Sequence, residues 1–133
     1  MRDISILVVD EDRYNVESIQ EALEHEDRTF LSAYSSDEAL QIASKISVNM
    51  IILDFCTSMQ KGGNFMKSMF GKGETPNVPV FMMSYRDDLS TKLLSYVSGA
   101  IRFFPKPVDI EDLRRGVEQI EKRNLNPQGA AIA

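Results

Sequence analysis

Acidic side chains directly follow two short apolar runs in this sequence. The run Ile4–Val9 precedes Asp10 and Glu11, and the run Met50–Leu53 precedes Asp54. An ionised carboxylate at the end of a buried segment is costly unless other groups compensate its charge. Carboxylates that share a pocket repel one another, and a hard divalent cation such as Mg²⁺ removes that conflict. In such a site Asp54 could remain ionised and attack phosphorus, so that an aspartyl phosphate forms.

Two more polar residues stand at the ends of later apolar runs. Ser84 ends the run Val78–Met83, and Lys106 follows the run Ala100–Phe104 closely. The lysine ammonium, together with the metal, would neutralise charge on transferred phosphoryl oxygens, and the serine hydroxyl would donate a hydrogen bond to one of them. Each residue taken alone could equally be a cap, turn or surface residue. Their occurrence together at the ends of separate runs favours one shared site.

The apolar runs alternate with segments of helical periodicity, and together they predict an α/β fold. Five strands are expected, at Ile4–Asp10, Thr29–Ser35, Met50–Asp54, Val78–Ser84 and Ala100–Phe104. Five helices are expected, at 13–25, 35–46, 64–70, 87–100 and from 110 onward. Most of the strands are uniformly apolar, as expected when helices cover both faces of a parallel sheet. The carboxyl ends of parallel strands lie along one edge, so the polar residues should meet there.

Helical spacing also predicts which side chains the helices bury. The second helix is expected to bury Ala39, Ile42, Ala43 and Ile46. The fourth helix is expected to bury Leu89, Leu93, Tyr96 and Val97, and to end at Gly99. In the last helix, Gly116 lowers helix propensity by about 1 kcal/mol, and close packing is the only reason that the sequence offers for it.

Length and composition indicate one globular domain. The chain has 133 residues, of which 43% are hydrophobic and 26% charged. No apolar run approaches the roughly 20 residues that span a bilayer, and no signal peptide is recognisable. The net charge of −5 argues against direct binding of nucleic acid, which needs a basic surface. A single cysteine, Cys56, excludes an internal disulfide and suits a reducing compartment, so we expect a cytoplasmic protein without membrane contact.

Four segments, ILVVDED, MIILDFCTSMQKGG, VPVFMMS and GAIRFFPKP, together resemble the receiver domain of two-component response regulators over residues 3–123. The resemblance implies a flavodoxin-like three-layer sandwich with a parallel sheet of strand order 2-1-3-4-5. It implies a receiver domain at 1–123, followed by a tail or the start of a linker at 124–133. The implied function is a phosphoryl-accepting signalling switch. Such a domain is no enzyme beyond its own phosphorylation and dephosphorylation.

The matched motif positions imply roles for individual residues. Asp54 corresponds to the phosphoacceptor, and Asp10 and Glu11 correspond to the acidic pair that holds Mg²⁺ with it. The backbone carbonyl of Cys56 corresponds to a further metal ligand. The other matched positions are Ser84 as the switch hydroxyl, Phe103 as the switch aromatic, Lys106 as the family's lysine, and Lys106–Pro107 as a cis peptide bond.

The resemblance also implies partners. The phosphoryl group would come from a histidine kinase or a phosphotransfer protein, and the output domain or protein is not identified by the sequence. Ser84 would move toward the phosphoryl group, and Phe103 would enter the vacated space. The face formed by the fourth helix, the fifth strand and the fifth helix would then change its partner preference, and a homodimer could form through it.

The sequence departs from the family pattern at two places near the expected site. Thr57 and Ser58 stand where most members carry Met-Pro, so that loop should be shaped differently. Tyr85 stands where a small residue is usual, and Arg86 adds a cation beside it. We expect the Tyr85 ring to narrow access to Asp54, which would slow phosphorylation and hydrolysis and give a long-lived phosphoryl state.

Two other interpretations remain open. The Asp-x-Asp pattern in ILVVDED resembles the motif of haloacid dehalogenase-type phosphatases, with Asp10 as nucleophile and Asp12 as acid/base. Alternatively, the chain is a degenerate receiver that serves only as a docking module. The first alternative requires a phosphoryl group on Asp10 and not on Asp54. The second requires that the chain fail to bind Mg²⁺ or to accept phosphate.

Overall fold

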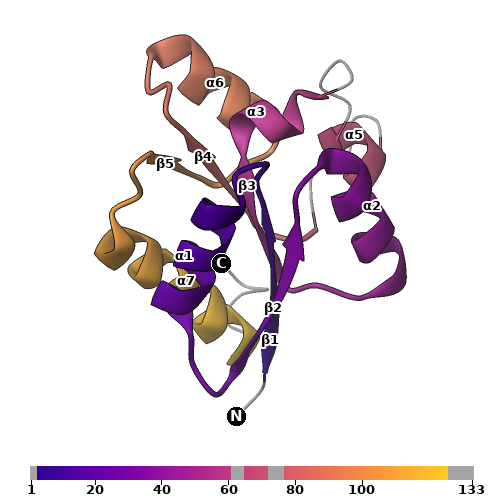
Figure 1. The fold of residues 1–133 in the computed structure, drawn as a ribbon, viewed down its shortest axis with the longest axis vertical. Coiled ribbons are helices and arrows are strands. Elements are labelled where there is room, and N and C mark those ends of the chain that lie inside the picture. Colours follow the sequence, from indigo (N-terminus) through magenta and orange to yellow (C-terminus); the bar gives the residue numbers. More distant parts are fainter. Residues whose placement is uncertain (1–2, 61–64, 72–76, 126–133) are drawn as a thin grey trace.

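A five-stranded parallel sheet forms the centre of the computed structural model, which describes residues 3–60, 65–71 and 77–125 (Figure 1). The strands are β1 (Ile4–Val9), β2 (Arg28–Ala33), β3 (Met50–Asp54), β4 (Val80–Ser84) and β5 (Arg102–Pro105). Their order is β2-β1-β3-β4-β5, and every neighbouring pair is parallel. The predicted flavodoxin-like sheet is therefore confirmed.

The described part of the chain contains six helices. They are α1 (Arg13–Leu23), α2 (Ser36–Lys45), α3 (Phe55–Ser58), α5 (Phe65–Phe70), α6 (Leu89–Val97) and α7 (Ile110–Leu125). Five of them correspond to the expected helices, although the expected start of the third, at residue 64, lies outside the described residues. The sequence pattern does not predict α3, which follows β3 without a break. No helix in the described ranges is both long and apolar enough to cross a membrane.

Helices cover both faces of the sheet (Figure 1). On one face, α1 and α7 bury a cluster that includes Val16, Ile19, Leu113, Val117 and Ile120. On the other face, α2 and α5 bury a cluster that includes Ala39, Phe65, Met66 and Phe70. Alternate residues of β1, β3 and β4 point into the two clusters. This is the physical reason why these strands are mostly apolar along their whole length.

The predicted inward face of α6 is wrong. The expected residues are 48% to 82% exposed, namely Leu89, Leu93, Tyr96 and Val97. Thr91 and Ser95 are buried instead. The Ser95 hydroxyl donates to the Thr91 carbonyl at 2.8 Å, so a polar side chain can lie inside without an unpaired group. In α2, Ile46 was likewise expected inside, but it follows the last helical residue and is 43% exposed.

Gly116 brings α7 close to the sheet. A Cβ atom at this position would lie 2.9 Å from Cε2 of Phe81 and 3.2 Å from its Cζ. The Phe81 ring is buried, with its centroid 5.4 Å from that of Phe104, so it has little room to move. We therefore expect Gly116→Ala to lower the free energy of unfolding by about 1–2 kcal/mol, because overpacking outweighs the gain in helix propensity.

Urea denaturation measures this effect, with Gln119→Ala on the exposed side of the same helix as the control. The control should be neutral or slightly stabilising, because alanine is the better helix former. If Gly116→Ala were as stable as the wild type, the Phe81 ring would have to move away from the new methyl group at little cost.

A lysine-bridged pair of carboxylates at the carboxyl edge of the sheet

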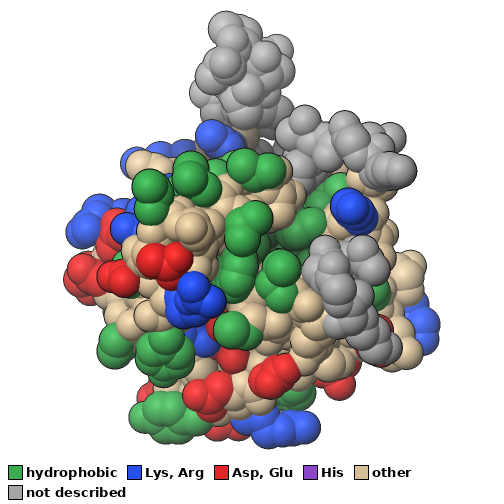
Figure 2. All heavy atoms as spheres, turned by 90° about the horizontal axis from the view of Figure 1, so that it is seen from above, with side chains coloured by type: hydrophobic (Ala, Val, Ile, Leu, Met, Phe, Trp, Pro, Cys, Tyr) green, Lys and Arg blue, Asp and Glu red, His purple; other side chains and the backbone are tan. Residues whose placement is uncertain are grey.

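Four of the predicted site residues lie at the carboxyl edge of the sheet. Asp10 directly follows β1, Asp54 and Ser84 end β3 and β4, and Lys106 directly follows β5. Because all five strands run in the same direction, these ends meet on one side of the molecule. Figure 2 views the molecule from this side and shows hydrophobic as well as acidic side chains exposed there.

Lys106 bridges two buried carboxylates. Its Nζ donates to Asp10 Oδ2 at 2.6 Å and to Asp54 Oδ1 at 2.7 Å. The Lys106 and Asp10 side chains are each 4% exposed, and that of Asp54 is 10% exposed. One ammonium thus compensates charge on two carboxylates that come from strands far apart in the sequence. Charge-assisted hydrogen bonds of this kind are among the strong polar interactions of proteins.

The surroundings of Lys106 act on its pKa in opposite directions. Burial alone would lower the pKa of the ammonium, because it disfavours the charged form. The hydrogen bonds to Asp10 and Asp54 act the other way, and on balance the pKa lies above its ordinary value of 10.5. Lys106 is therefore charged at neutral pH.

Because the pKa of Lys106 is raised, the fold should lose stability at alkaline pH. A group whose pKa is higher in the folded state stabilises the fold fully below its unfolded pKa, and this contribution is lost as pH rises through the folded pKa. We expect the free energy of unfolding to fall above about pH 10 more steeply in the wild type than in Lys106→Arg, since arginine stays charged there. Chemical denaturation at a series of pH values measures both slopes. Equal slopes would contradict the prediction, because the other lysines and the tyrosines titrate in both proteins.

Asp10 accepts further hydrogen bonds from the start of α1. Its Oδ2 accepts from Asn15 Nδ2 at 2.7 Å, and its Oδ1 accepts from the Asp12 backbone N–H at 3.0 Å. Asp12 is the N-cap of α1, and its carboxylate accepts from the Tyr14 backbone N–H at 3.0 Å. In this structure Asp12 therefore has a capping role, whereas Asp10 belongs to the buried site.

Asp54 is at once the last residue of β3 and the N-cap of α3. Its Oδ2 accepts from the Thr57 backbone N–H at 2.9 Å and from the Thr57 hydroxyl at 3.0 Å. Thr57 is fully buried, and its Oγ1 also accepts from the Glu11 backbone N–H at 3.3 Å. The sequence singles out Thr57 only as a departure from a family pattern. The Asp-x-x-Thr spacing of a helix cap, placed at a strand end, is the signal that could have identified it.

The Glu11 carboxylate is directed away from the lysine bridge. Glu11 is exposed, and its Oε1 accepts from Gln60 Nε2. Gln60 Oε1 in turn accepts from the backbone N–H and the hydroxyl of Ser36, at 3.1 and 3.2 Å. Of the expected acidic set, the structure brings together Asp10 and Asp54 but not the Glu11 side chain. Accordingly, no group of three or more His, Cys, Asp or Glu side chains in the described ranges is arranged to hold a metal ion.

The loop after β4 lies beside the lysine. Ser84 is 2% exposed, its Oγ accepts from the Arg86 backbone N–H at 2.9 Å, and its carbonyl accepts from the Lys106 backbone N–H at 2.8 Å. The Tyr85 ring centroid lies 5.1 Å from Lys106 Nζ, within the range of a cation–π interaction. Tyr85 is nevertheless 70% exposed, so the ring is part of the surface above the site.

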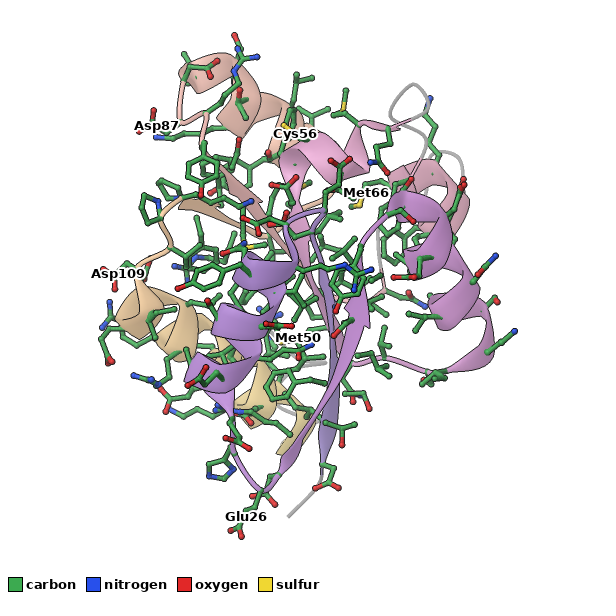
Figure 3. The ribbon with its side chains drawn as sticks, in the orientation of Figure 1. Glu26, Met50, Cys56, Met66, Asp87 and Asp109 are labelled. Atoms are coloured by element: carbon green, nitrogen blue, oxygen red, sulfur yellow. The ribbon has the colours of Figure 1, made fainter. Side chains whose placement is uncertain are left out.

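Cys56 and Phe103 differ in exposure. Cys56 is exposed on α3, at the same end of the molecule as Asp87 and opposite to Glu26 (Figure 3). Its carbonyl accepts from the Met59 backbone N–H at 3.2 Å. Phe103 is 9% exposed and packs in the apolar cluster on the α2 and α5 face of the sheet. The Lys106–Pro107 peptide bond is cis.

Comparisons with known proteins agree on one family. The family described as response regulator receiver domain matches residues 6–118. Response regulator MprA of Mycobacterium tuberculosis is 27% identical over 128 residues, which cover 96% of this chain and 54% of MprA. Transcriptional regulatory protein YvrH of Bacillus subtilis is 29% identical over 124 residues, which cover 92% of this chain and 51% of YvrH. The chain thus spans about half the length of these relatives.

Solved structures of the same family share the fold. A two-component response regulator from Clostridium difficile has a TM-score of 0.81 at 24% identity, covering 93% of this chain and 99% of the other. A putative response regulator from Chloroflexus aurantiacus has a TM-score of 0.78 at 25% identity, covering 90% of this chain and 98% of the other. The family match over residues 6–118 favours a receiver over a hydrolase of the haloacid dehalogenase type. This chain belongs to the family of response regulator receiver domains of two-component systems.

Proposed function

We propose that Asp54 accepts a phosphoryl group in the presence of Mg²⁺ and that the chain works as a phosphoryl-dependent switch. The observation that carries the proposal is the position of Lys106 Nζ, within 2.7 Å of both Asp10 and Asp54 in a buried setting. A fixed cation beside a carboxylate is what a phosphoryl acceptor needs, because negative charge accumulates on the oxygens of the transferred group. Among the family's functions, this geometry supports phosphoryl acceptance better than docking alone.

The residues present fit Mg²⁺. Asp10 and Asp54 would hold the ion, because both offer carboxylate oxygens, the ligands that Mg²⁺ prefers, and they already share one cation. The Glu11 carboxylate would become a further metal ligand after its hydrogen bond to Gln60 breaks. The Cys56 carbonyl would become another after its hydrogen bond from the Met59 backbone N–H breaks. When bound, Mg²⁺ supplies further neutralisation of the phosphoryl oxygens. Lys106 and the metal would then divide the charge of the site between them.

The transfer step moves the phosphoryl group from a donor to the Asp54 carboxylate. One oxygen of Asp54 forms a bond to the donor's phosphorus, and the bond from phosphorus to the donor breaks. The leaving group departs with that electron pair, as acetate from acetyl phosphate or as an imidazole from phosphohistidine. Ser84 Oγ, which accepts from Arg86, can donate its own hydroxyl proton to a phosphoryl oxygen.

A conformational change at Ser84 of β4 and Phe103 of β5 completes the proposed switch. Ser84 would move toward the phosphoryl group and Phe103 into the space it leaves, and the face formed by α6, β5 and α7 would change shape. The exposed apolar side chains of α6 support a role for this face in binding a partner, which includes a second copy of the chain. The phosphoryl source is proposed to be a histidine kinase or a phosphotransfer protein, in the cytoplasm.

The organisation of the longer protein is also proposed. We assign 1–123 to the receiver and 124–133 to a tail or linker, most of which lies outside the described residues. A relative about twice as long is named a transcriptional regulatory protein, which supports an output carried by another segment or another protein. The net charge of −5 argues against direct contact of this domain with nucleic acid.

Incubation with acetyl phosphate and Mg²⁺, followed by mass spectrometry of the intact chain and of its peptides, tests the proposal. We expect one Mg²⁺-dependent phosphoryl group, located on Asp54. A phosphoryl group on Asp10 would indicate hydrolase-type chemistry, and no phosphoryl group at any Mg²⁺ concentration would indicate a docking module. Removal of the donor then measures the lifetime of the phosphoryl state, which Tyr85 beside Lys106 is expected to prolong.

A further inference from the structure

We propose that the Thr57 hydroxyl sets the phosphorylation equilibrium of Asp54 by stabilising the unphosphorylated carboxylate. Thr57 would be a positioning residue that acts through Asp54 and disfavours the acyl phosphate. The inference rests on the proposed function, in which Asp54 is the phosphoacceptor.

The geometry fixes the direction in which the hydroxyl proton points. Thr57 Oγ1 accepts from the Glu11 backbone N–H at 3.3 Å, so a lone pair of that oxygen faces the loop after β1. The hydroxyl proton is then directed at Asp54 Oδ2, 3.0 Å away. Because Thr57 is fully buried, water does not compete for this bond. Asp54 Oδ2 therefore has two donors from Thr57, the backbone N–H at 2.9 Å and the hydroxyl.

Phosphorylation weakens the bond between the Thr57 hydroxyl and Asp54. A carboxylate is a stronger acceptor than a neutral oxygen, and hydrogen bonds to charged groups are about twice as strong as those between neutral groups. If Asp54 Oδ1 binds phosphorus, Oδ2 becomes the carbonyl oxygen of an acyl phosphate; if Oδ2 binds phosphorus, it becomes the oxygen that bridges the acyl carbon and phosphorus. In both cases Thr57 loses an ionised acceptor, so the hydroxyl favours the unphosphorylated state.

The same bond affects both rates. In the forward step the Asp54 carboxylate forms a bond to phosphorus and the donor leaves with the electron pair of the broken bond. In hydrolysis, water forms the new bond to phosphorus, the carboxylate leaves with the electron pair of the broken bond, and both protons of the water stay with the inorganic phosphate. A donor that stabilises the carboxylate makes it a weaker nucleophile and a better leaving group. Thr57 should therefore slow phosphorylation and speed its loss.

A second Asp-x-x-Thr cap in this chain supports the effect of such a hydroxyl. Asp88 caps α6, and its carboxylate accepts from the Thr91 hydroxyl at 2.8 Å and from the Thr91 backbone N–H at 3.3 Å. The hydrogen bond from the Thr91 hydroxyl is the largest cause of a lowered pKa of Asp88. The Thr91 hydroxyl thus stabilises the ionised form of the Asp88 carboxylate. The two caps also provide a matched pair for experiment.

The test compares the wild type with Thr57→Val, which removes the hydroxyl and keeps the shape and the backbone N–H. With Mg²⁺ and acetyl phosphate we expect Thr57→Val to be phosphorylated faster and to lose the phosphoryl group more slowly once the donor is removed. The ratio of the two rate constants should rise about fivefold, which corresponds to about 1 kcal/mol, the difference between a charged and a neutral hydrogen bond. Thr57→Ser restores the hydroxyl and should return the ratio to within about twofold of the wild type. Thr91→Val, the control at the other cap, should leave both rates unchanged.

The outcomes separate the two proposals. If wild-type Asp54 is phosphorylated and Thr57→Val has wild-type rates, or is slowed in both directions, the role of Thr57 is overturned while Asp54 remains the acceptor. If the wild type carries no phosphoryl group on Asp54, the proposed function fails, and the role of Thr57 with it. If urea denaturation shows that Thr57→Val is poorly folded, Thr57→Ala removes the same hydroxyl and provides the same comparison.

Discussion

Asp54→Asn is expected to abolish acyl phosphate formation, with a loss in rate of at least about 1,000-fold, because an amide oxygen is a very poor nucleophile toward phosphorus. The fold should survive the change. The amide oxygen still accepts from the Thr57 backbone N–H and hydroxyl, so the cap of α3 is retained. Incubation with acetyl phosphate and Mg²⁺, followed by intact mass, measures the effect, and urea denaturation checks the fold.

Asp88→Asn is the matched control for this variant. Asp88 is also an N-cap aspartate with a threonine three residues later, but its carboxylate interacts with Arg86 on the surface. The Asp88→Asn variant should be phosphorylated at the same rate and to the same extent as the wild type. Persistent labelling of Asp54→Asn would place the acceptor elsewhere, and Asp10, which shares the lysine with Asp54, would be the next candidate.

Strand positions and the convergence of the site could be predicted from the sequence for one reason. In a parallel sheet between two helical layers, both faces of a strand are buried, so β1 and β3 appear as mostly apolar runs. The residue that follows each run must then lie at the carboxyl edge. This is why Asp10 and Lys106, 96 residues apart, could be assigned to one site and do form a hydrogen bond.

The orientations of individual side chains were harder to predict. Glu11 directly follows Asp10, but its carboxylate turns to Gln60, since this glutamine is also held by Ser36 at the start of α2. That choice depends on tertiary contacts between three segments far apart in the sequence, which no local pattern contains. The capping role of Asp54 was missed for a related reason: an aspartate that ends a buried strand suggests a ligand site before it suggests a helix cap.

The error in α6 has a different cause. Its apolar residues Leu89, Leu93 and Val97 lie on one side of the helix, so helical spacing selects that side as the inner face, but in the structure it is the exposed side. The side that faces the sheet carries Thr91 and Ser95, whose hydroxyls donate to Asp88 and to the Thr91 carbonyl. Buried polar groups with internal partners are compatible with a core, but a pattern based on hydrophobicity alone cannot find them. The consequence is an exposed apolar surface beside β5, which supports the proposed role of that face in binding partners.

Lys106→Met is expected to lower the free energy of unfolding by about 3–5 kcal/mol in the absence of Mg²⁺, the range found when one partner of a buried ion pair is removed. Asp10 and Asp54 would both lose the cation that now lies within 2.7 Å of each. Phosphorylation by acetyl phosphate should also slow by about 100-fold, because a fixed positive charge near the transferred group is lost. Urea denaturation and intact mass measure the two effects.

Added Mg²⁺ distinguishes a loss of charge compensation from a simple packing defect. A divalent ion between Asp10 and Asp54 can take over the neutralising role of the ammonium, so Mg²⁺ should stabilise Lys106→Met more than it stabilises the wild type, in which metal and lysine compete for the same oxygens. Lys67→Met, at an exposed position of α5, changes the net charge equally and should show neither the destabilisation nor the larger response to Mg²⁺. If Lys106→Met were as stable as the wild type without metal, the lysine bridge would not be what holds the two carboxylates in the fold. If it were unstable but indifferent to Mg²⁺, Asp10 and Asp54 would not form the metal site.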